Sequence, residues 1–109
     1  MTRLVGQHMM VDGHLSQPLN TELLTDILTK LTRLVGLTPL GDSLTHESDH
    51  GWAGLQMIAE SHISLHSWDD NFWLDVFSCR AFDPEVVLGY VREWGRPRHT
   101  TILNRSAGP

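Results

Sequence analysis

The stretch AESHISLHSWDD, residues 59–70, concentrates side chains that can donate or accept protons or attack a carbonyl. Ser61 supplies a hydroxyl, His66 an imidazole, and Cys79, the single cysteine of the chain, supplies a thiol shortly after them. A hydroxyl or thiol becomes a nucleophile when a base removes its proton, and a thiol can also act as a general acid. These residue types predict covalent or proton-transfer chemistry centred on Ser61, His66 and Cys79.

Two well-known versions of this chemistry lack their usual sequence signals. No Gly-x-Ser-x-Gly segment surrounds Ser61, as one common form of acyl transfer would require. No helix is predicted to begin directly after Cys79, where it would activate the thiol. A cysteine in an apolar run such as DVFSC is also commonly a small buried hydrophobe. From the residues alone, the catalytic and the packing interpretation of Cys79 both stay open.

The histidines offer a second interpretation. His62 and His66 are four residues apart and could share one face of a strand or helix, with His46 and His50 as further metal ligands. No paired cysteines and no His-Glu-x-x-His segment accompany them. Polar residues at the end of a strand would give the same pattern, so a metal site is the minor alternative and we expect none.

Apolar runs flank this segment and must position it. The sequence predicts a first strand over residues 4–12. It then predicts two or three strands in quick succession, over residues 52–61, 62–68 and 71–79. Residues 38–44 read as a weaker strand, followed by a polar turn.

Two helices complete the predicted elements. Residues 20–36 repeat apolar side chains at spacings of three and four, with Asn20 as the cap and Gly36 after the end. Residues 83–95 begin with Asp83 as the cap, followed by proline at the first helical position.

The order strand, helix, several strands, helix predicts an α+β fold. We expect a two-layer sandwich in which both helices lie on one face of a mostly antiparallel sheet. The predicted domain covers residues 1–95, and residues 96–109 are expected to be a loosely held tail.

The composition limits the function classes. The net charge of −5 at pH 7 disfavours a surface that binds nucleic-acid phosphates. No apolar run reaches the length of a membrane span, and the N-terminus carries no hydrophobic signal region. A lone cysteine cannot form an internal disulfide, which favours a reducing compartment. We therefore expect a cytoplasmic protein with no nucleic-acid or membrane partner.

The stretch AESHISLHSW, followed by DVFSC, resembles the core of the prokaryotic S-adenosylmethionine decarboxylase proenzymes, a pyruvoyl-dependent family. The earlier GQHMMVD is similar to the Gly-x-His strand that opens these proteins, and the resemblance runs from about Gly6 to Trp94. It implies a chain that cleaves itself between Glu60 and Ser61. It also implies that Ser61 becomes a pyruvoyl group, with no metal and no pyridoxal phosphate.

The resemblance further implies roles for single residues. His66 would assist the proton transfers of self-cleavage. The substrate amine would form a Schiff base with the keto group, and Cys79 would return a proton to the carbanion left by carbon dioxide. Trp68, Asp70 and Glu47 would contact the substrate. The chain would form a homodimer with active sites at the interface.

Departures from the family pattern bear on self-cleavage and on the substrate. Ala53 replaces a serine that assists cleavage, and Asp70 replaces a glutamate that holds the ribose hydroxyls. The stretch around Glu47 and Ser48 replaces an aromatic residue that stacks on adenine. We expect decarboxylation of S-adenosylmethionine for spermidine synthesis. The alternatives are the same chemistry on L-ornithine or L-arginine, and an unprocessed, non-catalytic paralogue that binds a ligand or an active subunit.

Overall fold

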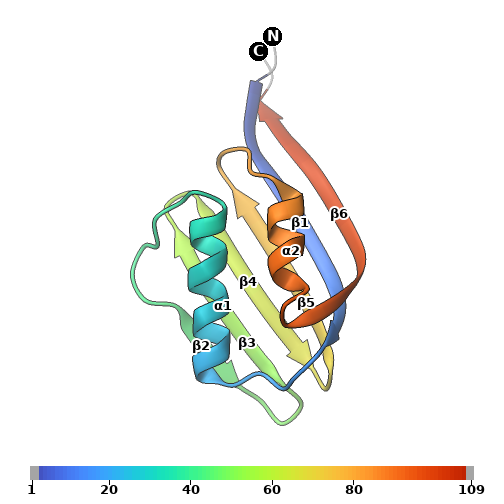
Figure 1. The fold of residues 1–109 in the computed structure, drawn as a ribbon. Helices are drawn as coiled ribbons and strands as arrows, with labels where there is room; N and C mark the ends of the chain where they lie inside the picture. The colour runs from blue at the N-terminus through green and yellow to red at the C-terminus, as the bar shows by residue number, and fades with distance from the viewer. Residues whose placement is uncertain (1–2, 108–109) are drawn as a thin grey trace.

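The computed structural model describes residues 3–107, and this part of the chain forms six strands and two helices. In chain order they are β1 (Arg3–Leu15), α1 (Thr21–Leu34), β2 (Leu44–Glu47), β3 (Trp52–Ile58), β4 (Ser61–Trp68), β5 (Asn71–Ser78), α2 (Pro84–Val91) and β6 (Gly95–Ala107). The strands form one antiparallel sheet in the order β2-β3-β4-β5-β1-β6. Both helices cover the same face of it (Figure 1). The predicted α+β sandwich is confirmed.

The helices form where the capping residues and the apolar spacing predicted them. The Asn20 side chain accepts a hydrogen bond from Leu23 N at 2.8 Å, and Asp83 accepts one from Glu85 N at 3.0 Å. These bonds satisfy N–H groups that lack a partner in the first turn of a helix. Neither helix of the described residues is long and apolar enough to cross a membrane.

The strands alternate between a face under the helices and a face turned away from them. On β4, the side chains under the helices belong to Ser61, Ile63, Leu65 and Ser67, and all four are buried. The intervening side chains point to the other side. We call this second side the open face; on β1, β4 and β5 it carries His8, Met10, Asp12, His62, Ser64, His66, Trp73, Asp75 and Phe77.

The C-terminal segment corrects the expectation of a loosely held tail. It forms β6, which pairs with β1 along the whole length of both strands, and the two extend as a ribbon beyond the rest of the sheet (Figure 1). Most side chains of β6 are exposed. Backbone hydrogen bonds to β1 hold this edge strand, so it needs no alternating apolar pattern.

The second strand also differs from the prediction, because β2 covers residues 44–47 rather than 38–44. The preceding segment is a loop fixed by hydrogen bonds to β3. Leu40 N donates to Met57 O at 2.9 Å, and Gln56 Nε2 donates to Gly41 O at 3.1 Å. Gly41 has a φ of 78°, which an extended strand does not contain.

Candidate active site

The turn between β3 and β4 consists of Ala59 and Glu60, and Ser61 is the first residue of β4. Ala59 has a φ of 50°, in the left-handed region that costs a residue with a side chain roughly 1–2 kcal/mol. Glu60 is exposed, whereas Ser61 is only 2% exposed. The Glu60–Ser61 peptide bond therefore joins a strained turn to a rigid strand, with the serine hydroxyl inside the protein.

The Ser61 hydroxyl contacts the segment that carries Cys79. The backbone N–H of Cys79 donates a hydrogen bond to Ser61 Oγ at 2.8 Å, and the Cys79 side chain is exposed. A donor directed at the hydroxyl oxygen stabilises negative charge that develops there as the proton leaves. The fold therefore brings together two of the predicted site residues.

Two buried polar residues that the sequence analysis did not single out hold the same segment. Ser78 Oγ accepts a hydrogen bond from Arg80 N at 3.1 Å, and Gln7 Oε1 accepts one from Phe82 N at 3.2 Å. Gln7 and Ser78 are directly opposite each other on β1 and β5. Their position is a usable sequence signal, because a polar residue at an inward position of an alternating strand needs a partner.

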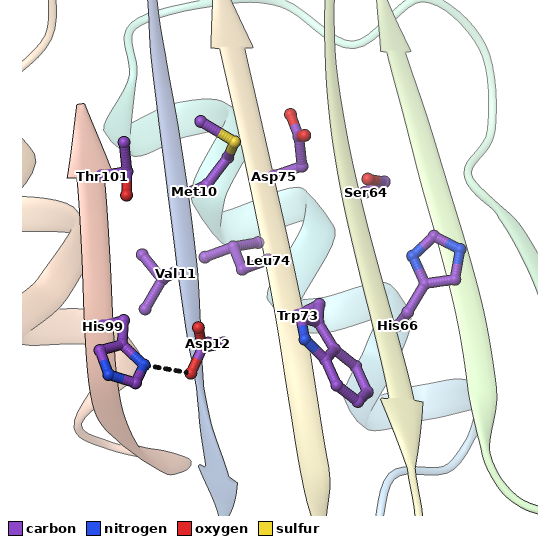
Figure 2. Close-up of a pocket in the computed structure, with 10 residues that line it drawn as sticks. All are labelled: Met10, Val11, Asp12, Ser64, His66, Trp73, Leu74, Asp75, His99 and Thr101. Atoms are coloured by element: carbon purple, nitrogen blue, oxygen red, sulfur yellow. Dashed lines mark hydrogen bonds and ion pairs between the residues drawn. The ribbon is translucent and has the colours of Figure 1, made fainter. Parts of the chain in front are cut away.

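His66 lies on the open face, five residues beyond Ser61 along β4. Five residues of strand span roughly 16 Å. The cross-strand neighbours of His66 are Ala53 on β3 and Trp73 on β5. His66 and Trp73 line a hollow of about 360 Å³. Figure 2 shows their side chains at one end of this hollow, with Asp12 on β1 and its hydrogen-bond partner His99 on β6. The structure does not bring His66 to the Ser61 of the same chain.

The three predicted substrate contacts lie at the end of the sheet opposite to Ser61. Trp68 is the last residue of β4, Asp70 follows in the turn to β5, and Glu47 is the last residue of β2. The exposed indole of Trp68 stacks on the His50 ring, with centroids 4.4 Å apart and planes inclined by 20°. These side chains share one region, but a single chain does not place them at Ser61.

Three ionisable side chains form a cluster on the open face beside Ser61. His8 Nε2 lies 2.7 Å from Asp75 Oδ1, and His62 Nε2 lies 3.5 Å from the same oxygen. The Phe77 ring lies near both imidazoles, with centroid distances of 5.6 Å to His8 and 5.7 Å to His62. We call this group the His8–Asp75–His62 cluster. It includes the residue that directly follows Ser61.

A second hollow, of about 490 Å³, includes Ser61 itself. It is lined by Leu55, Met57, Ala59, Glu60, Ser61, His62 and Ser64. His62 is therefore the imidazole in this hollow, whereas His66 belongs to the hollow of Figure 2. Across residues 3–107, no group of three or more His, Cys, Asp or Glu side chains has the geometry to hold a metal ion.

Comparison with known proteins shows the family of the chain. Residues 7–106 match the family described as S-adenosylmethionine decarboxylase. The chain is 30% identical over 94 residues to an S-adenosylmethionine decarboxylase proenzyme of Clostridium botulinum, with 81% of each chain covered. It is 30% identical over 77 residues to a proenzyme of the same name from Acidithiobacillus ferrooxidans, covering 68% of this chain and 58% of that one. The chain belongs to the S-adenosylmethionine decarboxylase family, whose members are pyruvoyl-dependent carboxy-lyases.

Proposed function

We propose that this chain is the proenzyme of an S-adenosylmethionine decarboxylase that cleaves itself between Glu60 and Ser61. One contact carries the proposal: the Cys79 N–H donates to Ser61 Oγ at 2.8 Å. It joins the two residues that the family resemblance makes the pyruvoyl precursor and the proton donor. Because the Ser61 hydroxyl is buried, oriented and next in sequence to the Glu60 carbonyl, the local residues fit a pyruvoyl group formed at this position.

Each residue around the bond has a task in this proposal. The Ser61 hydroxyl attacks the Glu60 carbonyl carbon and the amide becomes an ester, while the Cys79 N–H stabilises the attacking oxygen. The left-handed backbone of Ala59 raises the energy of the intact turn and favours its opening. Elimination from the ester would release the Glu60 carboxylate and leave dehydroalanine at position 61, and hydrolysis with loss of ammonia would give the pyruvoyl group. Its carbonyl would withdraw electrons during the loss of carbon dioxide. The exposed Cys79 thiol is the proton donor to the product carbon.

Denaturing mass spectrometry of the full chain tests the processing step. We expect two fragments, one ending at Glu60 and one beginning with a pyruvoyl group at position 61. Ser61→Ala should remain a single chain, and Ser16→Ala, a serine in the exposed loop before α1, should be cleaved as wild type is. A wild-type chain that stays intact on long incubation would favour the non-catalytic paralogue.

The spacing along β4 supports an active site shared by two chains. His66 and Trp68 lie five and seven residues beyond Ser61, which is roughly 16 and 23 Å along an extended strand. The open face also exposes the apolar side chains of Met57 and Trp73, at 47% and 48%. Exposed apolar side chains on a sheet face are typical of an interface. In a homodimer that packs open face to open face, with the strands of the two sheets running in opposite directions, the partner's His66 approaches the hollow that Ser61 and His62 line.

Mixing two defective chains tests this arrangement. Ser61→Ala keeps His66, and His66→Ala keeps Ser61, so only a mixed dimer combines the two residues across an interface. We expect His66→Ala to be cleaved slowly alone and much faster when co-expressed with Ser61→Ala. The double variant Ser61→Ala/His66→Ala, used as the partner, should give no rescue. Mixed dimers without any rescue would show that His66 does not act across the interface.

We propose S-adenosylmethionine as the substrate, and the supply of aminopropyl groups for spermidine as the role. The substrate has a cationic sulfonium and a planar adenine. The carboxylates of Glu47 and Asp70 and the exposed indole of Trp68 suit these groups. In the proposed dimer, this end of one chain lies over Ser61 of the other.

Release of labelled carbon dioxide from S-adenosylmethionine, L-ornithine and L-arginine, measured in parallel, tests the substrate. We expect release from S-adenosylmethionine alone. Asp70→Asn should raise its KM and leave cleavage of the proenzyme unchanged, because no cleavage step of this proposal uses the Asp70 carboxylate. Turnover of a basic amino acid without turnover of S-adenosylmethionine would reassign the substrate and leave the processing step intact.

A further inference from the structure

The hollow that includes Ser61 contains one imidazole, that of His62, and its Nε2 lies 3.5 Å from the Asp75 carboxylate. We propose that His62 is a general base that takes a proton from the ammonium group of the amino-acid substrate, with Asp75 as its positioning residue. This inference rests on the proposed function, because it requires an electrophilic carbonyl at position 61.

The contacts of His8 determine which of its nitrogens carries the proton. Arg105 Nη2 lies 3.2 Å from His8 Nδ1, and a guanidinium can only donate. His8 Nδ1 is therefore the acceptor, and Nε2–H donates to Asp75 Oδ1 at 2.7 Å. His8 thus uses both ring nitrogens as a neutral imidazole. It cannot take a substrate proton without losing one of these contacts.

The same carboxylate orients His62 and leaves its other nitrogen free. Asp75 Oδ1 lies 3.5 Å from His62 Nε2, and because an ionised carboxylate can only accept, this contact favours the tautomer of His62 with the proton on Nε2. Among residues 3–107, His62 Nδ1 has no hydrogen-bond partner, and the side chain is 42% exposed. The lone pair of His62 Nδ1 is therefore available in the hollow that Ser61 also lines.

An amino-acid substrate requires such a group. Its amine is largely protonated near neutral pH and then has no lone pair for addition to a carbonyl. In the proposed step, one N–H bond of the ammonium breaks, one N–H bond forms at His62 Nδ1, and the electron pair stays on the substrate nitrogen. The other ionisable side chain of the hollow, Glu60, lies in the exposed turn that cleavage opens. His62 stays on the strand, held by Asp75.

Two nucleophiles of different protonation state test the inference on the processed protein. Phenylhydrazine is unprotonated at neutral pH, whereas S-adenosylmethionine carries an ammonium group. Each forms a covalent adduct with the carbonyl, and the S-adenosylmethionine adduct is trapped with cyanoborohydride; mass spectrometry then gives both rates. We expect His62→Gln to slow the S-adenosylmethionine adduct roughly a hundredfold and to leave the phenylhydrazine adduct unchanged. Asp75→Asn should give a smaller loss with the same selectivity.

A matched control is His99→Gln, because His99 Nδ1 also pairs with a carboxylate, Asp12, at 3.2 Å but lies outside the hollow of Ser61. It should change neither rate. The inference would be overturned if each adduct formed in His62→Gln at the same rate as in wild type. It would also be overturned if His62→Gln slowed both adducts by the same factor. If His62→Gln is not cleaved, the rates of the two adducts are compared between Asp75→Asn and wild type instead. A wild-type chain that forms no phenylhydrazine adduct would overturn the proposed function and this inference together.

Discussion

The two faces of the sheet are built by alternate residues of the same strands, yet their chemistry is opposite. The face under the helices buries apolar side chains such as Phe72 and Leu65, and its few polar groups, Ser61 among them, are hydrogen-bonded. The open face carries exposed or half-buried His, Asp, Ser and Trp side chains such as His66 and Trp73. Ser61, the proposed pyruvoyl precursor, belongs to the first face, and the imidazoles belong to the second. We infer that the face under the helices holds the bond to be broken. We infer that the open face supplies groups for proton transfer and the surface that contacts the partner subunit.

The largest effect that separates the faces is expected for two neighbours on β5. Phe72 is fully buried and its ring packs against Trp94, with centroids 5.0 Å apart, whereas Trp73 is 48% exposed. Phe72→Ala should lower the free energy of unfolding by about 3–5 kcal/mol. Trp73→Ala should cost about 1 kcal/mol or less. Urea unfolding in a Ser61→Ala background that keeps the chain intact measures both, at a protein concentration low enough for the proposed homodimer to dissociate.

Sedimentation of the same variants separates folding from association. Trp73→Ala should weaken the proposed homodimer although it leaves each subunit folded. A Trp73→Ala variant as destabilised as Phe72→Ala would show that both faces are core, and the distinction drawn between them would be wrong.

The sequence predicted most of the elements because their signals are local. Asn20 and Asp83 cap their helices as expected, and the alternation along β4 is plain in the sequence. The bounds of β2 and the presence of β6 were not predicted, because both strands are held in place by pairing with strands elsewhere in the chain. In β6, for example, Gly95 pairs with Leu15.

The site was partly predictable by the same rule. Ser61 and His66 are five residues apart, and an odd separation on a strand places two side chains on opposite faces. That conclusion was not available from the sequence, because the prediction ended one strand at residue 61 and began the next at residue 62, whereas the structure places both residues on β4. The His8–Asp75–His62 cluster was not predictable either, because it depends on β5 lying between β4 and β1.

A smaller effect is expected at two neighbours on β3. Gly54 faces the helices, where an added Cβ would lie 2.9 Å from atoms of the buried Leu24 side chain. Gly54→Ala should therefore lower the free energy of unfolding by about 1–3 kcal/mol. Ala53 faces the open side directly opposite His66. Ala53→Ser should leave stability within about 0.5 kcal/mol of wild type and speed self-cleavage, since it places a hydroxyl beside that imidazole.

Urea unfolding and the time course of cleavage distinguish these two neighbours. Ala53→Val, which adds apolar volume at the same position without a hydroxyl, controls for size and should not speed cleavage. Faster cleavage in Ala53→Val would mean that packing, rather than the hydroxyl, limits the rate.

The smallest effect is expected in the helix layer, where burial acts on a single titratable group. The pKa of Tyr90 lies above its ordinary value of 10.0, first because burial disfavours the phenolate, and then because Glu93 and Asp26 add negative charge nearby. The folded state therefore holds this proton more tightly than the unfolded state does. The contribution to stability is complete below about pH 10 and is lost as the pH rises through the folded-state pKa.

Tyr90 is the only tyrosine of the chain, so tyrosinate absorbance reports it alone. Glu93→Gln should lower its pKa without restoring the ordinary value, whereas Glu85→Gln, on the same helix, should leave it unchanged. A full return to the ordinary value in Glu93→Gln would show that charge, rather than burial, is the main cause.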